Sequence, residues 1–444
     1  MANISEIKDK SGNTVYKVTV FLGRNSDNKQ IKKSKTFRPE PSMKKREIKK
    51  ALETFAADFE AKCKSGSIVA ERQTLQDYAA HWLSDFAEKE LENTTVTRYK
   101  HGLNNTILPR IGYMKLADIK ASTVQEFLNS MREKGYKRGG TWIPYSEESV
   151  RTCKIILSSV LSSAVADGLI STNPCSVRQR QHKKVQRKEV RCFSVEQAAR
   201  FLEVIEKPIP IIVPEHMAKR HGKETLIPEF QQGFLEVSLK FRALYALTIF
   251  SGLRRGELLG LQWKDVDFKE GSINVVRTVQ YTPSEGIFIK APKSSAGFRT
   301  IFLPEAVMIK LHELKKEQRK HMLSLGTAWN GSKKMNDNFV FTQETGEPMF
   351  PSTPRAELNR ILKTYNKCVK DNTEKLPMIS LHELRHTSAS ILIASGLEAT
   401  AVAQRLGHSD ASITLQVYAH SFSERDKVAS NALESALLSP AKCG

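Results

Sequence analysis

The sequence is poor in acidic side chains and has no long apolar run. Its 48 Asp and Glu stand against 69 Lys and Arg, which gives a formal net charge of +21 over 444 residues. No stretch of about 18 apolar residues occurs, and the first residues lack the apolar segment of a signal peptide. We therefore expect a soluble, cytoplasmic protein that has no membrane partner.

Cysteines are few and are not clustered. The six cysteines lie far apart, with no Cys-x-x-Cys pair and no grouping of Cys with His. Closely spaced Cys and His side chains are what structural zinc sites and disulfide frameworks require. The sequence therefore predicts reduced thiols, no metal site and no other cofactor.

The excess of positive charge points to a polyanionic partner. A surface far from neutral generates a field that attracts and retains phosphate-rich ligands. The chain is 40% hydrophobic and 26% charged, which is enough to bury ordinary cores and excludes a wholly disordered protein. Its length predicts about two to four domains.

Two domains are predicted before the middle of the chain. Residues 1–66 combine alternating segments at Val15–Phe21 and Lys33–Phe37 with a Lys-rich helical pattern, and the first fifty residues hold 14 Lys and Arg against five acids. A solvated basic domain without a ligand would show the same charges. Residues 70–180 instead carry apolar residues at helical spacing, which predicts a helical domain.

A basic linker at residues 181–192 leads into the last predicted domain, residues 193–444. The linker belongs to a segment with seven Lys and Arg and one Glu, which suits contact with phosphates as well as a tether in water. The last domain is predicted to be mostly helical, with three short strands at Ile273–Val279, Ile287–Lys290 and Arg299–Leu303.

The first candidate catalytic residue opens a helix in this last domain. The apolar run Phe241–Phe250 predicts a helix that ends at Ser251-Gly252, so Arg254 lies at the start of the next helix. Main-chain N–H groups and the helix dipole favour an anion at that position. An ion pair between Arg254 and Glu257, one turn further on, is the structural alternative.

A second helix carries a histidine and an arginine on one face. Ser380 and Glu383 form a capping-box pattern, which places His382 and Arg385 near the helix start and three residues apart. His386 lies one turn from His382, so helical phase alone does not choose between the two histidines. A packed or capping histidine is the alternative for either.

Three further side chains complete an ordered set. Lys293 falls in the turn between the second and third predicted strands, Gly407 is a predicted left-handed cap that presents His408, and Tyr418 follows ten residues later. Taken singly, a solvated turn lysine and a packed tyrosine are the ordinary interpretations.

Together these groups suit phosphoryl transfer without a metal. Two guanidinium groups can neutralise the non-bridging oxygens of one phosphate, an ammonium group can protonate a leaving oxygen, and a phenol can attack. Phenol has a pKa near 10, so the attacking group needs a proton acceptor or a strong positive field, and the set offers both.

In this order and spacing the residues resemble the tyrosine recombinases, specifically the phage and integrative-element integrases of Gram-positive bacteria. SGLRRGELLGLQW is similar to the first arginine box, HELRHT to the HxxR box, and LGHSDASITLQVYAH to the final His-to-Tyr segment. The resemblance implies a role for each matching residue: catalytic arginines Arg254 and Arg385, box histidines His382 and His408, turn lysine Lys293, nucleophile Tyr418 and supporting Glu257.

The resemblance also implies the architecture, a multidomain α+β fold. Residues 1–66 resemble an arm-type DNA-binding domain made of a small β-sheet plus a helix. Residues 70–180 resemble an all-helical, SAM-like core-binding domain, and residues 193–444 a mostly helical catalytic domain with a small three-stranded sheet and a C-terminal tail helix. Two segments, 207–229 and 326–338, look like insertions.

The implied activity is site-specific recombination through a 3′-phosphotyrosyl intermediate that integrates or excises a mobile element. The implied partners are double-stranded DNA at core and arm attachment sites, three further copies of the chain in a tetramer, a host DNA-bending protein and an excisionase. A type IB topoisomerase and a non-enzymatic DNA-binding regulator are the alternatives. The apolar stripe of the tail fits packing on its own domain or docking on a neighbour.

Overall fold

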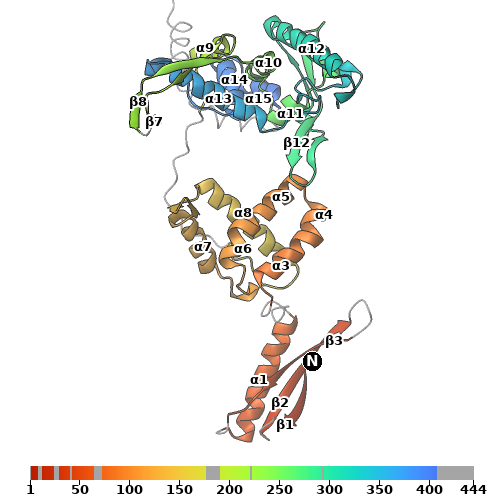
Figure 1. Cartoon of the computed structure of the whole chain (residues 1–444). Coiled ribbons are helices and arrows are strands. Elements are labelled where there is room, and N and C mark those ends of the chain that lie inside the picture. The colour runs from red at the N-terminus through yellow and green to blue at the C-terminus, as the bar shows by residue number, and fades with distance from the viewer. Residues whose placement is uncertain are drawn as a thin grey trace, which may run out of the picture. The chain divides into compact units, whose positions relative to one another are not determined.

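The computed structural model describes residues 2–8, 13–24, 30–40, 43–64, 73–176, 191–220, 223–292 and 295–407. Contacts between Cα atoms divide the chain into two compact units, Met1–Val185 and Gln186–Gly444. Figure 1 colours the first unit red to yellow and the second green to blue. Most of the predicted linker, Lys293, His408, Tyr418 and the predicted tail helix lie outside the described residues. The four-part domain division stays a prediction.

The N-terminal residues form a three-stranded antiparallel sheet with one helix. The strands β1 (Asn3–Lys8), β2 (Thr14–Arg24) and β3 (Gln30–Phe37) follow that order across the sheet, and α1 spans Lys45–Lys64. Alternation along β2 turns every second side chain toward α1, where a small core forms from Val18, Val20, Leu52, Ala56 and Phe59. Helix α1 therefore covers one face of the sheet (Figure 1).

Strand β1 is absent from the prediction, which has two strands here. Its two apolar residues, Ile4 and Ile7, are three positions apart and therefore fall on opposite faces of a strand. All six residues of β1 are exposed, so the period-2 signal of a half-buried strand does not arise.

Residues 73–176 form a helical domain with a core of its own. Helix α8 packs against α3, α5 and α7, and the indole Nε1 of Trp82 donates to Ser163 Oγ at 2.7 Å. The elements are α3 (Leu75–Trp82), η1 (Leu83–Ala87), α4 (Glu88–Glu90), α5 (Asn93–Gly102), η2 (Leu103–Ile107), α6 (Leu108–Ile111), η3 (Leu116–Asp118), α7 (Ala121–Glu133), β4 (Tyr136–Arg138), β5 (Thr141–Ile143) and α8 (Glu147–Ala166).

The helical prediction for this domain needs one correction, because a β-hairpin joins α7 to α8. Strands β4 and β5 pair antiparallel across Gly139 and Gly140, whose φ angles are 57° and 87°. Two consecutive positive φ values are those of the tight hairpin turn that glycine favours. Among the described helices α8 alone is long and apolar enough to cross a membrane, and one face of it, which includes Ile156, Leu157 and Leu161, belongs to this core.

The second unit is built around helix α10 (Leu239–Ser251). Consecutive residues from Ala243 to Ile249 are buried, which is typical of a helix surrounded by protein on all sides. It contacts α9, α12 and α14. The helices of this unit are α9 (Val195–Val204), α10, α11 (Arg255–Gly260), η4 (Trp263–Asp265), η5 (Ser295–Gly297), α12 (Glu305–Leu325), η6 (Gly326–Ala328), η7 (Met335–Asp337), α13 (Thr353–Cys368), η8 (Asn372–Glu374), α14 (Leu381–Ala394) and α15 (Ala399–Leu406).

A three-stranded sheet is present, but its strands differ from those predicted. It consists of β10 (Val266–Asp267), β11 (Ser272–Val275) and β14 (Arg299–Phe302), with β11 in the centre. The predicted strand Ile273–Val279 is divided after Val275, and Arg277, in the break, pairs with Asp265. The chain after it forms a separate hairpin from β12 (Thr278–Thr282) and β13 (Gly286–Lys290).

The first predicted insertion, residues 207–229, takes part in a pair of β-ribbons. Strand β6 (Ile209–Val213) pairs with β9 (Phe230–Leu235), and between them β7 (His216–Arg220) pairs with β8 (Lys223–Ile227). The second, residues 326–338, holds the short helices η6 and η7 and bonds to the rest of the unit through Trp263 N and Asn338 O, 3.0 Å apart.

Candidate active site

Arg254 stands at the junction predicted from the sequence. Helix α10 ends at Gly252, which adopts the left-handed conformation with φ 65°, and Arg254 is the N-cap of α11. The Arg254 side chain is 40% exposed, so a ligand can reach it. Its Nη2 donates to the carbonyl oxygen of Gly407 at 2.7 Å, which ties it to the end of α15.

Glu257 is a buried carboxylate shared by two arginines. Oε1 lies 2.8 Å from Arg254 Nη1, and Oε2 lies 2.9 Å from Arg299 Nη2. The main-chain N–H of Arg254 also donates to Oε2, at 3.0 Å. Burial works to raise the pKa of Glu257, but the bonds and charge of Arg299 and the bonds from Arg254 outweigh it, so the pKa lies below its ordinary value. The ion pair offered as an alternative for Arg254 is thus present.

The HxxR segment lies where the capping box places it. Ser380 is the N-cap of α14, and its Oγ accepts from the main-chain N–H of Glu383. Arg385 is only 2% exposed. Its Nη1 donates to Gly252 O at 2.6 Å and its Nη2 to Leu406 O at 2.8 Å, so it joins the ends of α10 and α15.

Exposure distinguishes the two histidines that helical phase left open. His382 is exposed and His386 is half-buried, with ring centroids 4.7 Å apart in an edge-to-face arrangement. Surrounding protein atoms and the charges of Arg385 and Arg254 lower the pKa of His382. Burial, with His382 and Arg385, lowers the pKa of His386 to about 4. The neutral form of both rings is therefore favoured at pH 7, and His382 is the more accessible of the two to a ligand.

Three consecutive carbonyl oxygens at the end of α15 each bind a different arginine. Arg299 Nε donates to Arg405 O at 2.7 Å, Arg385 Nη2 to Leu406 O, and Arg254 Nη2 to Gly407 O. The negative end of the helix dipole also favours cations there. The two predicted arginines therefore meet at the point from which the chain continues to His408, and the charges of both act on His382.

Three members of the predicted set, Lys293, His408 and Tyr418, lie outside the described residues. Their described neighbours are placed as expected: β13 ends at Lys290 before the lysine turn, and Gly407 is left-handed with φ 71° directly before His408. Within the described ranges, no group of three or more His, Cys, Asp and Glu side chains could hold a metal ion.

Sequence reasoning missed two arginines of this region, Arg299 and Arg405. Arg405 Nη2 donates to Phe250 O at 2.9 Å and to Phe302 O at 3.0 Å. Apart from Gly297 O, which accepts from Arg299 Nη1, their partners lie 42 to 155 residues away along the chain, so no local spacing signals them. Only the start of a predicted strand marked the position of Arg299.

Two family models match the chain. The model described as "Phage integrase family" matches residues 228–425, and "Phage integrase, N-terminal SAM-like domain" matches residues 74–132. Together they cover more than half of the chain. The first match falls within residues 193–444 and the second within residues 70–180.

Curated relatives and solved structures agree with these matches. The chain is 26% identical to a "Tyrosine recombinase XerC-like" protein of Caldanaerobacter subterraneus subsp. tengcongensis, over 93% of each chain. It is 24% identical to the ICEBs1 integrase of Bacillus subtilis, over 66% of this chain and 67% of that one. In fold it is similar to a Tn1549 transposon integrase in complex with transposon right end DNA, with TM-score 0.62 and 22% identity, over 80% of this chain and 100% of that chain.

The family models and the named relatives agree with the family that the sequence motifs resemble. The expected multidomain α+β fold is likewise confirmed. The chain belongs to the tyrosine recombinase family, the family of the phage integrases.

Proposed function

We propose that the protein is a site-specific DNA recombinase that integrates or excises a mobile element, and that Tyr418 is its nucleophile. The observation that carries the proposal is the meeting of Arg254 and Arg385 at the end of α15, with His382 close enough for both charges to lower its pKa. The chain leaving this end reaches Tyr418 eleven residues after Gly407.

In the proposed reaction the Tyr418 hydroxyl oxygen attacks a scissile phosphate of DNA. A bond forms from that oxygen to phosphorus, and the bond from phosphorus to the 5′ oxygen breaks, which leaves a 3′-phosphotyrosyl link and a free 5′-hydroxyl. Arg254 and Arg385 stabilise the charge on the non-bridging oxygens. Lys293 protonates the leaving 5′ oxygen, His382 accepts the tyrosine proton, and His408 donates to a phosphate oxygen.

The neutral state of His382 favours this role. A proton acceptor must be unprotonated before it acts, and the lowered pKa of His382 keeps its ring neutral at pH 7. Because the attack exchanges one phosphodiester for another, the bond energy is conserved. The cycle therefore needs no ATP, and the reverse attack by a 5′-hydroxyl of another strand completes strand exchange.

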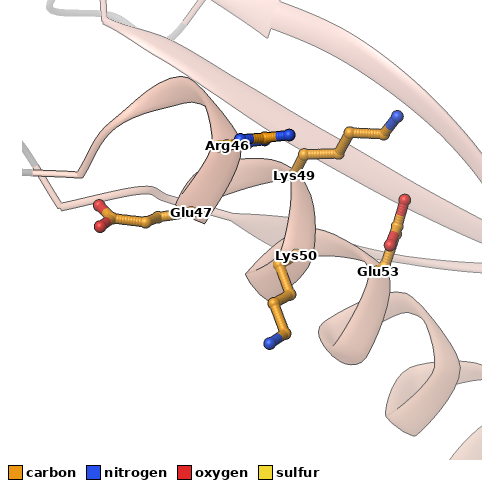
Figure 2. A pocket seen from close by; sticks show the side chains of 5 residues that line it. All are labelled: Arg46, Glu47, Lys49, Lys50 and Glu53. Atoms are coloured by element: carbon orange, nitrogen blue, oxygen red, sulfur yellow. The ribbon is translucent and has the colours of Figure 1, made fainter.

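The N-terminal sheet is the proposed arm-site reader. Its face away from α1 carries the exposed Lys17 of β2 and the exposed Lys32 of β3. On the same face of β3, Ser34 and Thr36 follow Lys32, and Thr36 pairs with Lys17. Lysines bind phosphates and hydroxyls bind base edges, a combination that suits a sheet lying in a DNA groove. A shallow pocket on α1, lined by three cations and two acids, is a weaker candidate because its net charge is only +1 (Figure 2).

The proposed assembly is a tetramer on DNA. Four copies would exchange strands in two steps between an element's attachment site and a host site in the bacterial cytoplasm. A host DNA-bending protein and an excisionase are the proposed accessory partners. Residues 70–180 would clamp the core site from one side of the duplex.

A suicide-substrate assay tests the proposal. The full chain is incubated with nicked duplexes made from the DNA that flanks its gene, and covalent protein–DNA product is measured for wild type, Tyr418→Phe and Tyr281→Phe. The control removes the hydroxyl of an exposed tyrosine on β12. We expect product from wild type and from the control and none from Tyr418→Phe. Undiminished product from Tyr418→Phe contradicts the proposal.

Two other outcomes identify the alternative functions. Relaxation of supercoiled DNA without paired specific sites would indicate a type IB topoisomerase. Specific binding without any covalent product would indicate a regulator.

A further inference from the structure

Arg299, the first residue of β14, is an almost completely buried arginine at the edge of the candidate active site. Its side chain is 7% exposed. Each guanidinium nitrogen has a protein partner: Nε donates to Arg405 O at 2.7 Å, Nη1 to Gly297 O at 3.1 Å, and Nη2 to Glu257 Oε2 at 2.9 Å. All three guanidinium nitrogens of Arg299 are thus engaged within the protein, and a direct contact with a ligand would break one of these hydrogen bonds.

Those neighbours are parts of the candidate active site. Glu257 lies between two guanidinium groups, with one oxygen bonded to Arg254 and the other to Arg299. The carbonyl oxygen of Arg405, which Arg299 binds, is the first of three consecutive carbonyl oxygens at the end of α15. The next two are bound by Arg385 and Arg254. Arg299 thus joins a strand, a carboxylate and a helix end in one side chain.

We propose that Arg299 is a positioning residue for strand cleavage. It fixes the Glu257 carboxylate, and through it Arg254, and it anchors the end of α15 from which the chain continues to His408 and Tyr418. The proposal rests on the proposed recombinase function and adds to it a residue that does not touch DNA.

Gly407 supports the proposal independently. It has φ 71°, and a Cβ placed on it would lie 2.6 Å from Arg299 Nη1. The left-handed cap and the guanidinium group therefore occupy adjoining space, and the backbone of α15 can approach Arg299 closely only because this residue is glycine. Planar, forked donors are needed to reach Arg405 O and Glu257 together, and a lysine at position 299 has one donor atom instead of three.

Arg277 provides a matched control for a purely structural arginine. It lies between β11 and β12 and is 17% exposed, pairs with the buried Asp265, and donates to Gly260 O at the far end of α11 from Arg254. Arg277→Lys removes the same fork from the same part of the chain without touching Arg254, Glu257 or α15.

The experiment compares wild type, Arg299→Lys and Arg277→Lys as full chains on the suicide duplex. Three quantities are measured: the rate constant of covalent product formation at saturating DNA, the Kd for the same duplex, and the melting temperature. We expect Arg299→Lys to lower the rate constant about 100-fold, since misplacement of a reacting group by about 1 Å has that effect. We expect the Kd of Arg299→Lys and the rate constant of Arg277→Lys each to stay within about threefold of the wild-type value.

A double-variant comparison tests the route through Glu257. If Arg299 acts through this carboxylate, Glu257→Gln combined with Arg299→Lys will be much less impaired than the product of the two single effects. Provided that wild type forms product, any of three results would overturn the proposal. These are a wild-type rate for Arg299→Lys, an equal loss of rate in Arg277→Lys, and single effects of Glu257→Gln and Arg299→Lys that multiply in the double variant. Absence of product from wild type would overturn the proposed function, and this proposal with it.

Discussion

Arg254 and Arg385 are held by main-chain oxygens at helix ends. Gly252, Leu406 and Gly407 supply the carbonyls, so the two guanidinium groups are oriented before a ligand arrives. Preorganised charge of this kind stabilises a transition state without reorganisation during the reaction. The orientation of each arginine is therefore part of the site.

Replacing Arg385 by lysine should keep the charge and lose the geometry. Lysine cannot reach both Gly252 O and Leu406 O while it faces a phosphate, so we expect covalent product to form about 10²- to 10³-fold more slowly. The control is Arg360→Lys, a surface arginine paired with Glu357 on α13, expected within about fivefold of wild type. Equal rates for Arg385→Lys and wild type would contradict this reading of the site.

The lowered pKa of His386 predicts that the folded protein loses stability in mild acid. Its pKa is about 4 in the folded protein against 6.5 as the ordinary value, so between these limits the unfolded chain binds more protons. Stability is fully present above pH 6.5 and falls as the pH is lowered toward 4, by about 2 kcal/mol between pH 7 and pH 5.

The measurement is the melting temperature at pH 7 and at pH 5. His386→Gln removes the titrating group, so its melting temperature should fall less than that of wild type, by several degrees. His312→Gln, at an exposed histidine of the same unit, is the control and should follow wild type. An unchanged pH dependence in His386→Gln would contradict the argument.

The positions of four site residues could be predicted because their cause is local. The left-handed glycine before Arg254 and the capping box around His382 and Arg385 are short-range signals, and the structure has both. Glu257 lies one helical turn after Arg254, so its position follows from the same local signal. Arg299 could not be predicted, because its partners come from α11 and from the end of α15, and sequence spacing carries no information on that meeting.

At the scale of the element, helices were predicted better than strands. Helices α10, α14 and α15 repeat their turns locally, and glycine or serine marks their ends. Strands depend on partners elsewhere: β11 pairs with β14 rather than with the chain that directly follows it. The β4–β5 hairpin was also missed, although its Gly-Gly turn is a local signal.

The end of α15 is the element on which the site most depends. Gly407→Ala adds a Cβ to a left-handed residue and crowds Arg299, whereas Gly396→Ala does so at φ 98° with no heavy atom within 4 Å. Both substitutions should cost about 1–2 kcal/mol of stability from backbone strain. Gly407→Ala should cost more and should also slow formation of covalent product. Denaturant unfolding and the suicide assay measure the two effects, and equal behaviour of both variants would argue against close packing at Gly407.

At the scale of the whole molecule, the net charge of +21 serves two purposes. Most cations would hold DNA without acting on it, and Arg254, Arg385 and Lys293 are the few proposed to act on one phosphate. Composition predicts a polyanion but does not separate these uses. The cations proposed to act on the phosphate, such as Arg254 and Arg385, are distinguished by helix caps and ion pairs that fix their positions.

Binding to DNA should therefore weaken steeply with salt. Log affinity falls by about 0.9 per neutralised phosphate on a log-salt scale, so Lys17→Gln and Lys32→Gln should each reduce the slope by about that amount. Lys50→Gln removes the same charge from α1, on the other side of the sheet (Figure 2), and should leave the slope unchanged. Titration of the flanking duplex at several salt concentrations gives the slopes. Equal slopes in all three variants would remove the open sheet face from the proposed interface.

The central claim is a covalent bond between Tyr418 and DNA, and its most direct test is to locate that bond. Covalent product from the suicide duplex is digested with nuclease and protease, and the modified peptide is sequenced by mass spectrometry. We predict a nucleotide attached through its 3′-phosphate to the Tyr418 oxygen, with a free 5′-hydroxyl on the released strand. Attachment to another residue, or a 5′-phosphate linkage, would contradict the account.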